Sequence, residues 1–511
     1  MNNLAEIIKQ EKLLEKDQKS LDKLKNTGRF TRESSSIYRN SLYLQASVLY
    51  FIGRIGNKKN LFAVSKTAFK TGLAGSFENT GGIFIFRVTL DFNNSLILKK
   101  LFPFTEAISL RDKCTTFGCG DRLGLAGAGH IRAAKKYQVY PVLAQQSIRE
   151  LTLTGRTYHD VTAAAVFLVF QEGYESGYGA DGDHLKTLDD IDTALSAGMP
   201  MITLDLSEVM NAQAANWQEK RLDDEFEKMP DAEKKYLFDN YADKTFTLGK
   251  EKIEMGRNEL KKCAVMYHKA LDFAAEVDRH LRSRRQDHYD LEISIDETTA
   301  PTLPSHHLFI ISELKRRRVT VNSLAPRFIG EFQKGIDYIG DKAEFEKQFR
   351  VHCAIAAKYG NYKISIHSGS DKFSVYPLIG KYTGCRLHAK TAGTSWLEAM
   401  RTIAGVNPAL YRKMHKKSFA CFEEAKKLYH ITADLSKIMD IDKMSDAELP
   451  GFLEQNESRQ LLHITYGGLL KDPEVRSDFF NTLDEYEDRH YDLVEMHITR
   501  HMKLLGIAEK K

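Results

Sequence analysis

Cysteine and long apolar runs are scarce in this chain, and each scarcity argues against a class of protein. The six cysteines show no CxxC or CxxxC spacing, which argues against a disulfide framework and against a cysteine-based zinc site. The apolar stretch LYLQASVLYFIG at 42–53 is too short to span a bilayer. The N-terminus is charged throughout and lacks the apolar core of a signal peptide. We therefore expect a cytoplasmic protein with reduced thiols and no membrane partner.

An excess of one charge is also absent. The 74 basic and 69 acidic side chains leave a net charge of +5, whereas nucleic-acid-binding proteins usually carry a concentrated basic face. With 42% hydrophobic and 28% charged residues, the composition is that of a folded globular protein. We expect a small-molecule partner and no nucleic acid, and a homo-oligomer stays open.

Residues 1–105 are expected to form an N-terminal α+β portion. Apolar residues recur at helical spacing through 1–26, which predicts an amphipathic helix. GGIFIFRVTLDF at 81–92 is rich in β-branched and aromatic residues and predicts a strand.

From about residue 115 the sequence pattern changes: short apolar runs end in polar residues and alternate with stretches of helical periodicity. GYGADGDHL (177–185), DLEISIDET (290–298) and YKISIHSGSDK (362–372) are examples, and we take QLLHITYGG (460–468) as a late strand of the same kind. Strands that alternate with helices form parallel sheets. About eight such units predict an α/β fold, a TIM-like (β/α) barrel over 106–470 with its site at the C-terminal ends of the strands.

Two segments stand outside this alternation. Residues from about 208 to 289 are strongly charged and mostly helical in pattern, and we expect a helical insertion over the barrel mouth. Residues 471–511 include a long amphipathic pattern, which predicts a C-terminal helical segment packed on the outside of the barrel.

Three predicted strand ends carry a histidine. His184 lies in GDHLK, His367 in ISIHSGSDK and His388 in RLHAK. Imidazole is the commonest metal ligand, and histidines from separate barrel strands can converge at the mouth. The alternative is that each is a hydrogen-bonded histidine at a strand end, and the sequence alone leaves both interpretations open.

Acidic and basic residues share these strand ends. Asp183 precedes His184, and Glu292 shares one face of its strand with Ser294 and Asp296. A carboxylate inside a barrel is costly unless it is paired or used. Glu292 is therefore either an ion-pair partner of Lys186, Lys390 or Arg327, or part of an acid/base pair. The other polar tips that are candidates for substrate binding are Asp121, Arg122, Gln145, Lys186, Arg327 and Lys372.

Common nucleotide and hydrolase motifs are missing. GAGH at 127–130 lacks the GxGxxG pattern and the later acidic partner of a dinucleotide site, and the chain has no GxxxxGK[ST] loop or GxSxG elbow.

Several long strings resemble the tagaturonate/fructuronate epimerase family. They are VFQEGYESGYGADGDHLKT, EISIDETTAPT, SLAPRFIGEFQKGIDYIGD, YKISIHSGSDKFSVYPLIGK and LHAKTAGTSWLEA, in order within 110–505. The resemblance implies a metal-dependent isomerase on a barrel that interconverts D-tagaturonate and D-fructuronate. It implies His184, His367 and His388 as ligands of a divalent cation such as zinc, nickel or manganese, Asp183 as proton acceptor and Glu292 as proton donor.

The implied chemistry can be compared with these side chains. The two keto acids differ at carbon 4, whose hydrogen is not acidic because the ketone is at carbon 2. Retro-aldol cleavage of the carbon 3–carbon 4 bond and re-addition would invert it, and needs a Lewis acid with an acid/base pair. A hydride route would need a nicotinamide cofactor, for which the sequence carries no fingerprint. The rival interpretations are an aldolase or ketose isomerase on a related sugar, and a non-catalytic hexuronate-binding protein.

Overall fold

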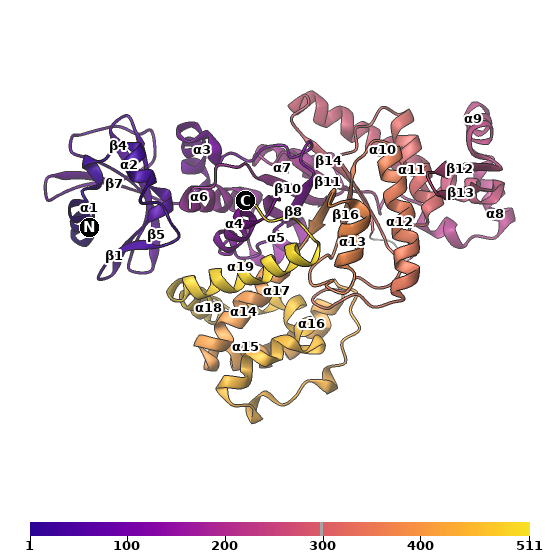
Figure 1. Cartoon of the computed structure of the whole chain (residues 1–511). Helices are drawn as coiled ribbons and strands as arrows, with labels where there is room; N and C mark the ends of the chain where they lie inside the picture. The colour runs from indigo at the N-terminus through magenta and orange to yellow at the C-terminus, as the bar shows by residue number, and fades with distance from the viewer. Residues whose placement is uncertain (297–299, 511) are drawn as a thin grey trace.

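Eight parallel strands close into a barrel at the centre of the molecule (Figure 1). The computed structural model describes residues 1–296 and 300–510. Around the barrel the strands follow the order β10-β11-β14-β15-β16-β17-β8-β9, which confirms the TIM-like α/β barrel expected from the sequence. Their bounds are β8 Thr115–Gly118, β9 Tyr140–Ser147, β10 Gly179–Leu185, β11 Met201–Asp205, β14 Asp290–Ile295, β15 Ser323–Pro326, β16 Lys363–Ile366 and β17 Leu387–Lys390.

Helices cover the outside of this barrel, and most of them follow a strand as expected. The long C-terminal helix α19 (Glu487–Leu504) packs on α4 (Gly127–Lys136), so the prediction of a helix packed outside the barrel is confirmed. The other covering helices are α5 Ile148–Thr154, α6 Tyr158–Glu172, α7 Leu188–Ser196, α10 Arg257–Arg285, α11 Pro304–Arg316, α12 Lys342–Lys358 and α13 Tyr376–Thr383.

One predicted strand is wrong. QLLHITYGG at 460–468 belongs to helices α16 (Asn456–Ile464) and α17 (Tyr466–Leu470). Residues 458–467 are all buried, and a short buried run of this kind cannot be told from a strand by periodicity alone. The last barrel strand in the described structure therefore ends at Lys390, well before residue 470.

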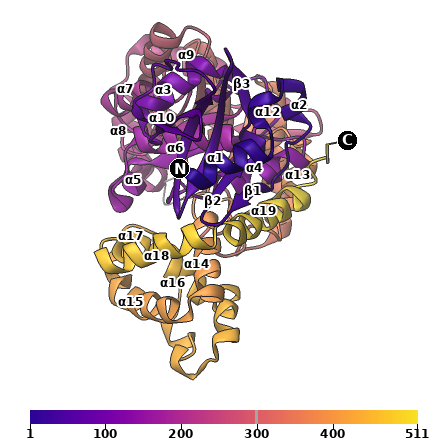
Figure 2. The ribbon, with the colours of Figure 1, turned by 90° about the vertical axis from the view of Figure 1, so that its left-hand side faces the viewer.

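The region after Lys390 forms a helical layer with a hydrophobic core of its own. Helices α14 (Thr394–Val406), α15 (Pro408–Lys426), α16, α17 and α18 (Pro473–Glu485) pack around Trp396 and Tyr411, both fully buried. Figure 2 shows this layer as a lobe beside the barrel. Its position matters because it supplies one wall of the cavity described below.

The segment expected over the barrel mouth lies elsewhere. It folds into α8 (Glu219–Phe226), α9 (Asp231–Tyr241) and a hairpin of β12 (Lys244–Leu248) and β13 (Glu251–Met255). The hairpin contacts α11 and α12, and α8 contacts α10, at the end of the molecule far from the N-terminal sheet (Figure 1). No described residue of 208–289 lines the central cavity. The prediction that this insertion covers the mouth was wrong, because its apolar side chains pack on the outer helices.

The N-terminal portion is built mainly of antiparallel strands, in the order β1-β2-β4-β5-β7-β6 with β3 paired to β4. The single helix expected over 1–26 is interrupted: α1 (Asn2–Gln10) ends before Lys12, whose φ of 51° is left-handed, and α2 (Gln18–Asp22) starts anew with Asp17 as its N-cap. The strands are β1 Arg29–Arg32, β2 Ser35–Tyr38, β3 Tyr43–Gln45, β4 Val48–Ile55, β5 Lys58–Ser65, β6 Gly75–Thr80 and β7 Ile83–Val88.

A buried ionic group joins this sheet to the barrel. Glu487 at the start of α19 accepts hydrogen bonds from Arg54 Nη1 (2.6 Å) and the Tyr38 hydroxyl (2.7 Å), and also pairs with Lys59. Burial alone would raise the pKa of Glu487, but Lys59 and Arg54 hold it at about 2. The carboxylate is therefore ionised in the folded protein at any pH above that value.

We expect Glu487→Gln to lower the free energy of unfolding by about 3–5 kcal/mol at pH 7, because it leaves buried cations without their anion. Since the pKa of Glu487 is depressed on folding, its contribution is present above the unfolded pKa of about 4.3 and is lost as the pH falls toward 2. Urea unfolding of both proteins between pH 7 and pH 3 should show the difference shrinking. Glu485→Gln, at an exposed position, is the control and should change stability by less than about 0.5 kcal/mol; equal stability of Glu487→Gln and wild type at pH 7 would contradict the assignment.

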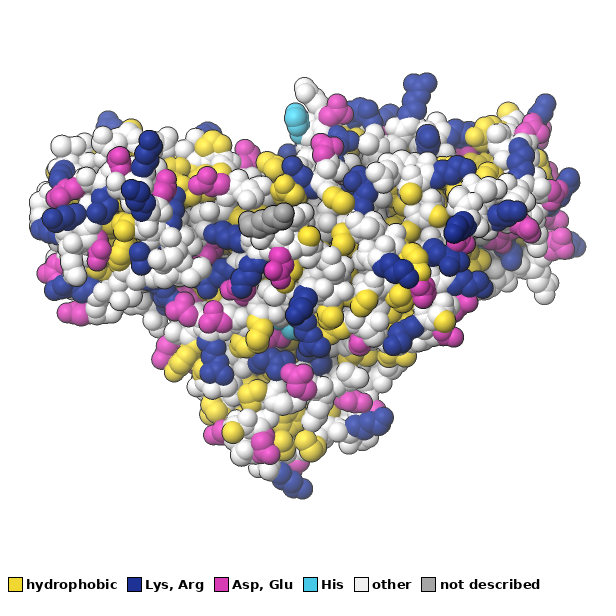
Figure 3. Space-filling model, in the orientation of Figure 1, with side chains coloured by type: hydrophobic (Ala, Val, Ile, Leu, Met, Phe, Trp, Pro, Cys, Tyr) yellow, Lys and Arg dark blue, Asp and Glu magenta, His cyan; other side chains and the backbone are white. Residues whose placement is uncertain are grey.

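Among the described residues, the search for a helix that is long and apolar enough to cross a membrane finds none. Acidic and basic side chains are interspersed on the face shown in Figure 3. The chemistry of the protein is therefore sought in its cavities.

Candidate active site

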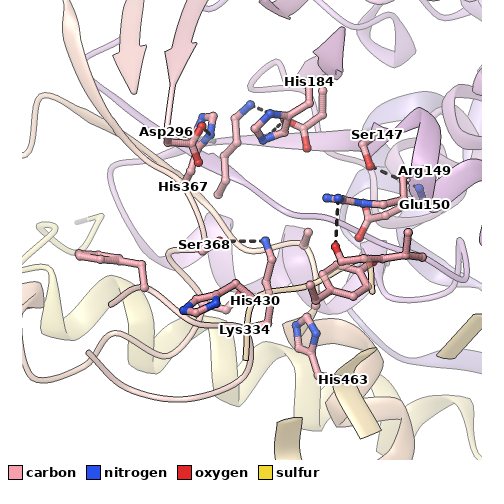
Figure 4. Close-up of a pocket in the computed structure, with 18 of the residues that line it drawn as sticks. Ser147, Arg149, Glu150, His184, Asp296, Lys334, His367, Ser368, His430 and His463 are labelled. Atoms are coloured by element: carbon pink, nitrogen blue, oxygen red, sulfur yellow. Dashed lines mark hydrogen bonds and ion pairs between the residues drawn. The ribbon is translucent and has the colours of Figure 1, made fainter. Parts of the chain in front are cut away.

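A cavity of about 690 Å³ opens at the C-terminal ends of the barrel strands (Figure 4). Its floor comes from the ends of β9, β10 and β17 and from the segments after β14 and β16. The loop that follows β15 and the helical layer complete its walls, the latter through Leu428, Tyr429, His430 and His463. It lies at the face where (β/α) barrels hold their sites, and its lining is rich in ionisable side chains.

His184 reaches this cavity because strand β10 is irregular at its end. The register of β10 against β11 shifts between Gly182 and Leu185, and His184 has a φ of 54°. A bulge of this kind redirects a side chain at the rim of a barrel, and a left-handed non-glycine residue is a strained feature typical of functional sites. Nδ1 of His184 faces Oδ2 of Asp205 at 3.6 Å, which leaves Nε2 for the cavity.

His367 and Asp296 complete a group with His184. His367 follows β16, and its Nδ1 lies 3.0 Å from Oδ1 of Asp296. Its Nε2 lies 2.6 Å from Oε1 of Glu292. The rings of His184 and His367 are 4.9 Å apart between centroids. One ligand atom from each of His184, Asp296 and His367 lies within 4.8 Å of the other two.

This group fits a divalent cation. Two imidazoles and one carboxylate are a common donor set for catalytic metals, which keep further positions open for substrate. Each histidine also has a carboxylate behind it, Asp205 for His184 and Glu292 for His367. Such carboxylate–histidine pairs orient metal-bound imidazoles. The buried Nδ1 of His184 and Oδ2 of Asp205 have no hydrogen-bond partner among the described residues, so their bonding is incomplete as the group stands.

A second buried group surrounds Lys390 at the end of β17. Its ammonium lies 2.6 Å from Asp183, 2.9 Å from Asp181 and 2.9 Å from Glu292. Burial opposes ionisation of these acids, but Lys390 outweighs it for Asp183 and lowers the pKa of that carboxyl. For Asp181 burial prevails and the pKa rises. Lys390 and Asp183 line the cavity, whereas Asp181 does not.

The structure brings together three of the five residues expected to act as ligands or acid/base groups. Asp183, His184 and His367 all line the cavity. Glu292 is fully buried behind His367 and does not line it, so a proton from Glu292 would have to pass through His367 or Lys390. His388 lies outside the group: its Nδ1 is 2.9 Å from the Thr116 hydroxyl, and burial lowers its pKa to about 3.

Three of the six substrate-binding candidates also reach the cavity. Arg122, Gln145 and Arg327 line it. Arg122 is already paired with Glu150 at 2.9 Å and stacked on Tyr466. Both amide atoms of Gln145 are buried without a hydrogen-bond partner among the described residues, as expected of a group that awaits a ligand.

The other three candidates do not line the cavity. The carboxylate of Asp121 accepts hydrogen bonds from the backbone N–H groups of Leu123, Gly124 and Ala126, and so holds the loop that follows it. Lys186 pairs with Glu208 at 2.9 Å. Lys372 donates to the carbonyls of Gln333, Ile336 and Ser370, and burial lowers its pKa to about 7. Each of these three side chains is therefore held by the protein itself and lies outside the lining of the cavity.

Sequence reasoning missed several residues of this site. Lys390 was considered only as an ion-pair partner of Glu292, and Asp296 only as a neighbour of Glu292 on one strand face. Both stand near the ends of predicted strands, which was the available signal. Lys334, whose Nζ lies 2.8 Å from the Ser368 hydroxyl, stands in a loop with no strand pattern. His463 was placed on a strand; it comes from α16, and its ring lies so close to Gly393 that a Cβ there would meet Nε2 at 1.6 Å.

Comparisons with known proteins point to one family. The family model described as UxaE, tagaturonate epimerase, matches residues 38–505. The tagaturonate/fructuronate epimerase of Thermotoga maritima is 39% identical over 469 residues, which cover 92% of this chain and 96% of that protein. The native crystal structure of fructuronate-tagaturonate epimerase from Cohnella laeviribosi matches with a TM-score of 0.88 and 44% identity, over 92% of this chain and 96% of that one. A glycerol complex of the same enzyme gives the same values. The chain therefore belongs to the tagaturonate epimerase family.

Proposed function

We propose that this chain interconverts D-tagaturonate and D-fructuronate by inverting carbon 4. The observation that supports it best is the group of His184, Asp296 and His367 beside Asp183 and Lys390, in one cavity at the catalytic face of the barrel. That arrangement combines a cation-binding donor set with a proton acceptor, which a retro-aldol reaction requires. The names of the relatives supply the substrate class.

His184, Asp296 and His367 are the residues that would hold the divalent cation. When bound there, the cation supplies Lewis-acid stabilisation of negative charge on the oxygens near carbon 2. Glu292 orients the imidazole of His367 from behind at 2.6 Å, and Asp205 stands behind His184 at 3.6 Å, beyond hydrogen-bond length. In this proposal the main role of Glu292 is to orient the ligand His367. As a proton donor, Glu292 could reach the substrate only through His367 or Lys390.

Asp183 is the proposed proton acceptor. Its carboxylate is kept ionised by Lys390 at 2.6 Å and faces the cavity. It takes the proton of the carbon 4 hydroxyl as the carbon 3–carbon 4 bond breaks. The bonding pair moves onto the carbon 2–carbon 3 unit to give an enediolate, and carbon 4 becomes an aldehyde. After the aldehyde turns its other face, the bond reforms and the proton returns to the carbon 4 oxygen.

Incubation of the purified protein with tagaturonate and a divalent metal tests the function. We expect NMR to show fructuronate accumulating to an equilibrium mixture, with no change in mass because the cleaved halves rejoin before release. A net yield of two three-carbon products would identify an aldolase instead. Binding of tagaturonate without turnover, unaffected by a chelator, would identify a binding protein.

A further inference from the structure

The cationic side chains of the cavity differ in whether an acid neutralises them. Arg122 pairs with Glu150, and Lys390 pairs with three acids. Lys334 and Arg327 also line the cavity, and neither forms an ion pair with a carboxylate among residues 1–296 and 300–510. A partly buried cation without an anion is costly for the protein alone. Such a cation in a cavity points to an anionic ligand.

Lys334 is the better placed of the two. Its ammonium has a single hydrogen bond within the described structure, to the hydroxyl of Ser368 at 2.8 Å. Ser368 directly follows His367, and its φ of 48° is left-handed. Figure 4 shows Lys334 reaching from the opposite wall toward Ser368, on the side of the cavity where His367 lies. Within residues 1–296 and 300–510, Arg327 forms no such bond with the metal-binding segment, and its hydrogen bonds are those of its backbone to Thr302.

The loop that carries Lys334 is rigidly held from below. Lys372 donates to the carbonyls of Gln333 and Ile336, on either side of Lys334. Arg459 Nε donates to the carbonyl of Gly335 at 2.6 Å, and another of its nitrogens lies 2.7 Å from Asp371. These buried bonds fix the loop before any ligand arrives, and a preorganised cation binds an anion without the cost of ordering it.

Burial lowers the pKa of Lys334, and nearby Arg149 lowers it further. A ligand carboxylate would reverse both effects, since it would replace lost hydration and oppose the charge of Arg149. The site therefore gains more from an anion than an exposed lysine would.

We propose that Lys334, aligned by Ser368, binds the carboxylate of the substrate and so selects sugar acids over neutral sugars. The inference rests on the proposed function and adds to it the group that recognises the acid. It also assigns Lys372 and Arg459 a positioning role, because they hold the loop without lining the cavity. The bond of Lys334 to Ser368, next to His367, places this cation on the side of the cavity where the metal-binding group lies.

Steady-state kinetics of K334M with tagaturonate and with the neutral ketohexose D-tagatose test this inference. Loss of a charge-assisted bond to a desolvated carboxylate should lower kcat/KM for tagaturonate on the order of 100-fold, mainly through KM. Turnover of D-tagatose, which has no carboxylate, should not fall. K334R, which keeps the charge in the loop, should raise KM for tagaturonate less than K334M does. K471M removes an exposed lysine outside the cavity and serves as the charge-matched control.

The outcomes separate the two proposals. If wild type fails to convert tagaturonate, the proposed function fails before any variant is measured. If wild type is active and K334M keeps its KM for tagaturonate, or loses both substrates equally, the assignment of Lys334 is overturned. Thermal melting and metal content of each variant establish that the fold and the metal group are intact. If K334M does not fold, K334Q, which also removes the charge, is measured in its place, and an unchanged KM of K334Q for tagaturonate overturns the inference.

Discussion

Replacing Asp183 by asparagine is expected to reduce kcat for tagaturonate by roughly 10²–10⁴-fold in a protein that remains folded. The amide has nearly the volume of the carboxylate but cannot accept the carbon 4 hydroxyl proton. Asp183 is the carboxylate of the Lys390 group that lines the cavity, so no neighbour replaces it at the same place. The effect should fall on kcat more than on KM, because proton transfer is needed only in the transition state.

Asp181→Asn is the matched control for this experiment. Asp181 also contacts Lys390, at 2.9 Å, but does not line the cavity. The control removes a similar charge from Lys390 without removing the proton acceptor, so its loss of kcat should be clearly smaller than that of Asp183→Asn. Equal effects of the two substitutions would mean that the charge around Lys390, and not proton transfer by Asp183, is what matters.

Removal of the metal is expected to abolish turnover. Substitution of His184 or His367 should also abolish turnover, and added metal should not restore it. We expect EDTA to inactivate the wild type and an added divalent cation to restore it. In His184→Ala and His367→Ala, metal affinity should fall by more than the roughly 10–100-fold that loss of an outer partner costs. The metal content measured by elemental analysis and the kcat of the same samples should fall together.

His388→Gln distinguishes the observed group from the one implied by resemblance. His388 is bonded to Thr116 and lies apart from the group of His184, Asp296 and His367. The variant should keep its metal, whereas Asp296→Asn should bind it more weakly. Full activity of exhaustively chelated wild type would contradict the metal assignment, and loss of metal from His388→Gln alone would restore His388 as a ligand.

The barrel and part of the site were predictable because they depend on local pattern. An apolar run followed by polar residues marks the end of a strand, and because the strands are parallel these ends lie at one face of the barrel. His184 and His367 could be found in this way. Asp296 directly follows the strand that carries Glu292, but sequence alone could not tell which of the two acids faces the cavity, since that depends on the tertiary structure.

The remaining site residues could not be predicted, because their positions depend on contacts between segments that are distant in the sequence. Lys334 stands in a loop whose position is set by Lys372 and Arg459, more than thirty residues away along the chain. The wall formed by His463 comes from a helix that resembles a strand in sequence, because its residues from Ser458 onward are all buried. Lys372 stands at a predicted strand end and was a candidate for substrate binding, but in the structure it donates hydrogen bonds to three backbone carbonyls. Neither periodicity nor charge pattern reports such tertiary partners.

The most direct test of the account uses fructuronate deuterated at carbon 4, converted by the metal-loaded protein in ordinary water and followed by NMR. Cleavage and re-addition at the carbon 3–carbon 4 bond never breaks the bond between carbon 4 and its hydrogen. We therefore predict tagaturonate that retains its deuterium, at unchanged mass. Tagaturonate that carries solvent hydrogen at carbon 4 would contradict the proposed chemistry.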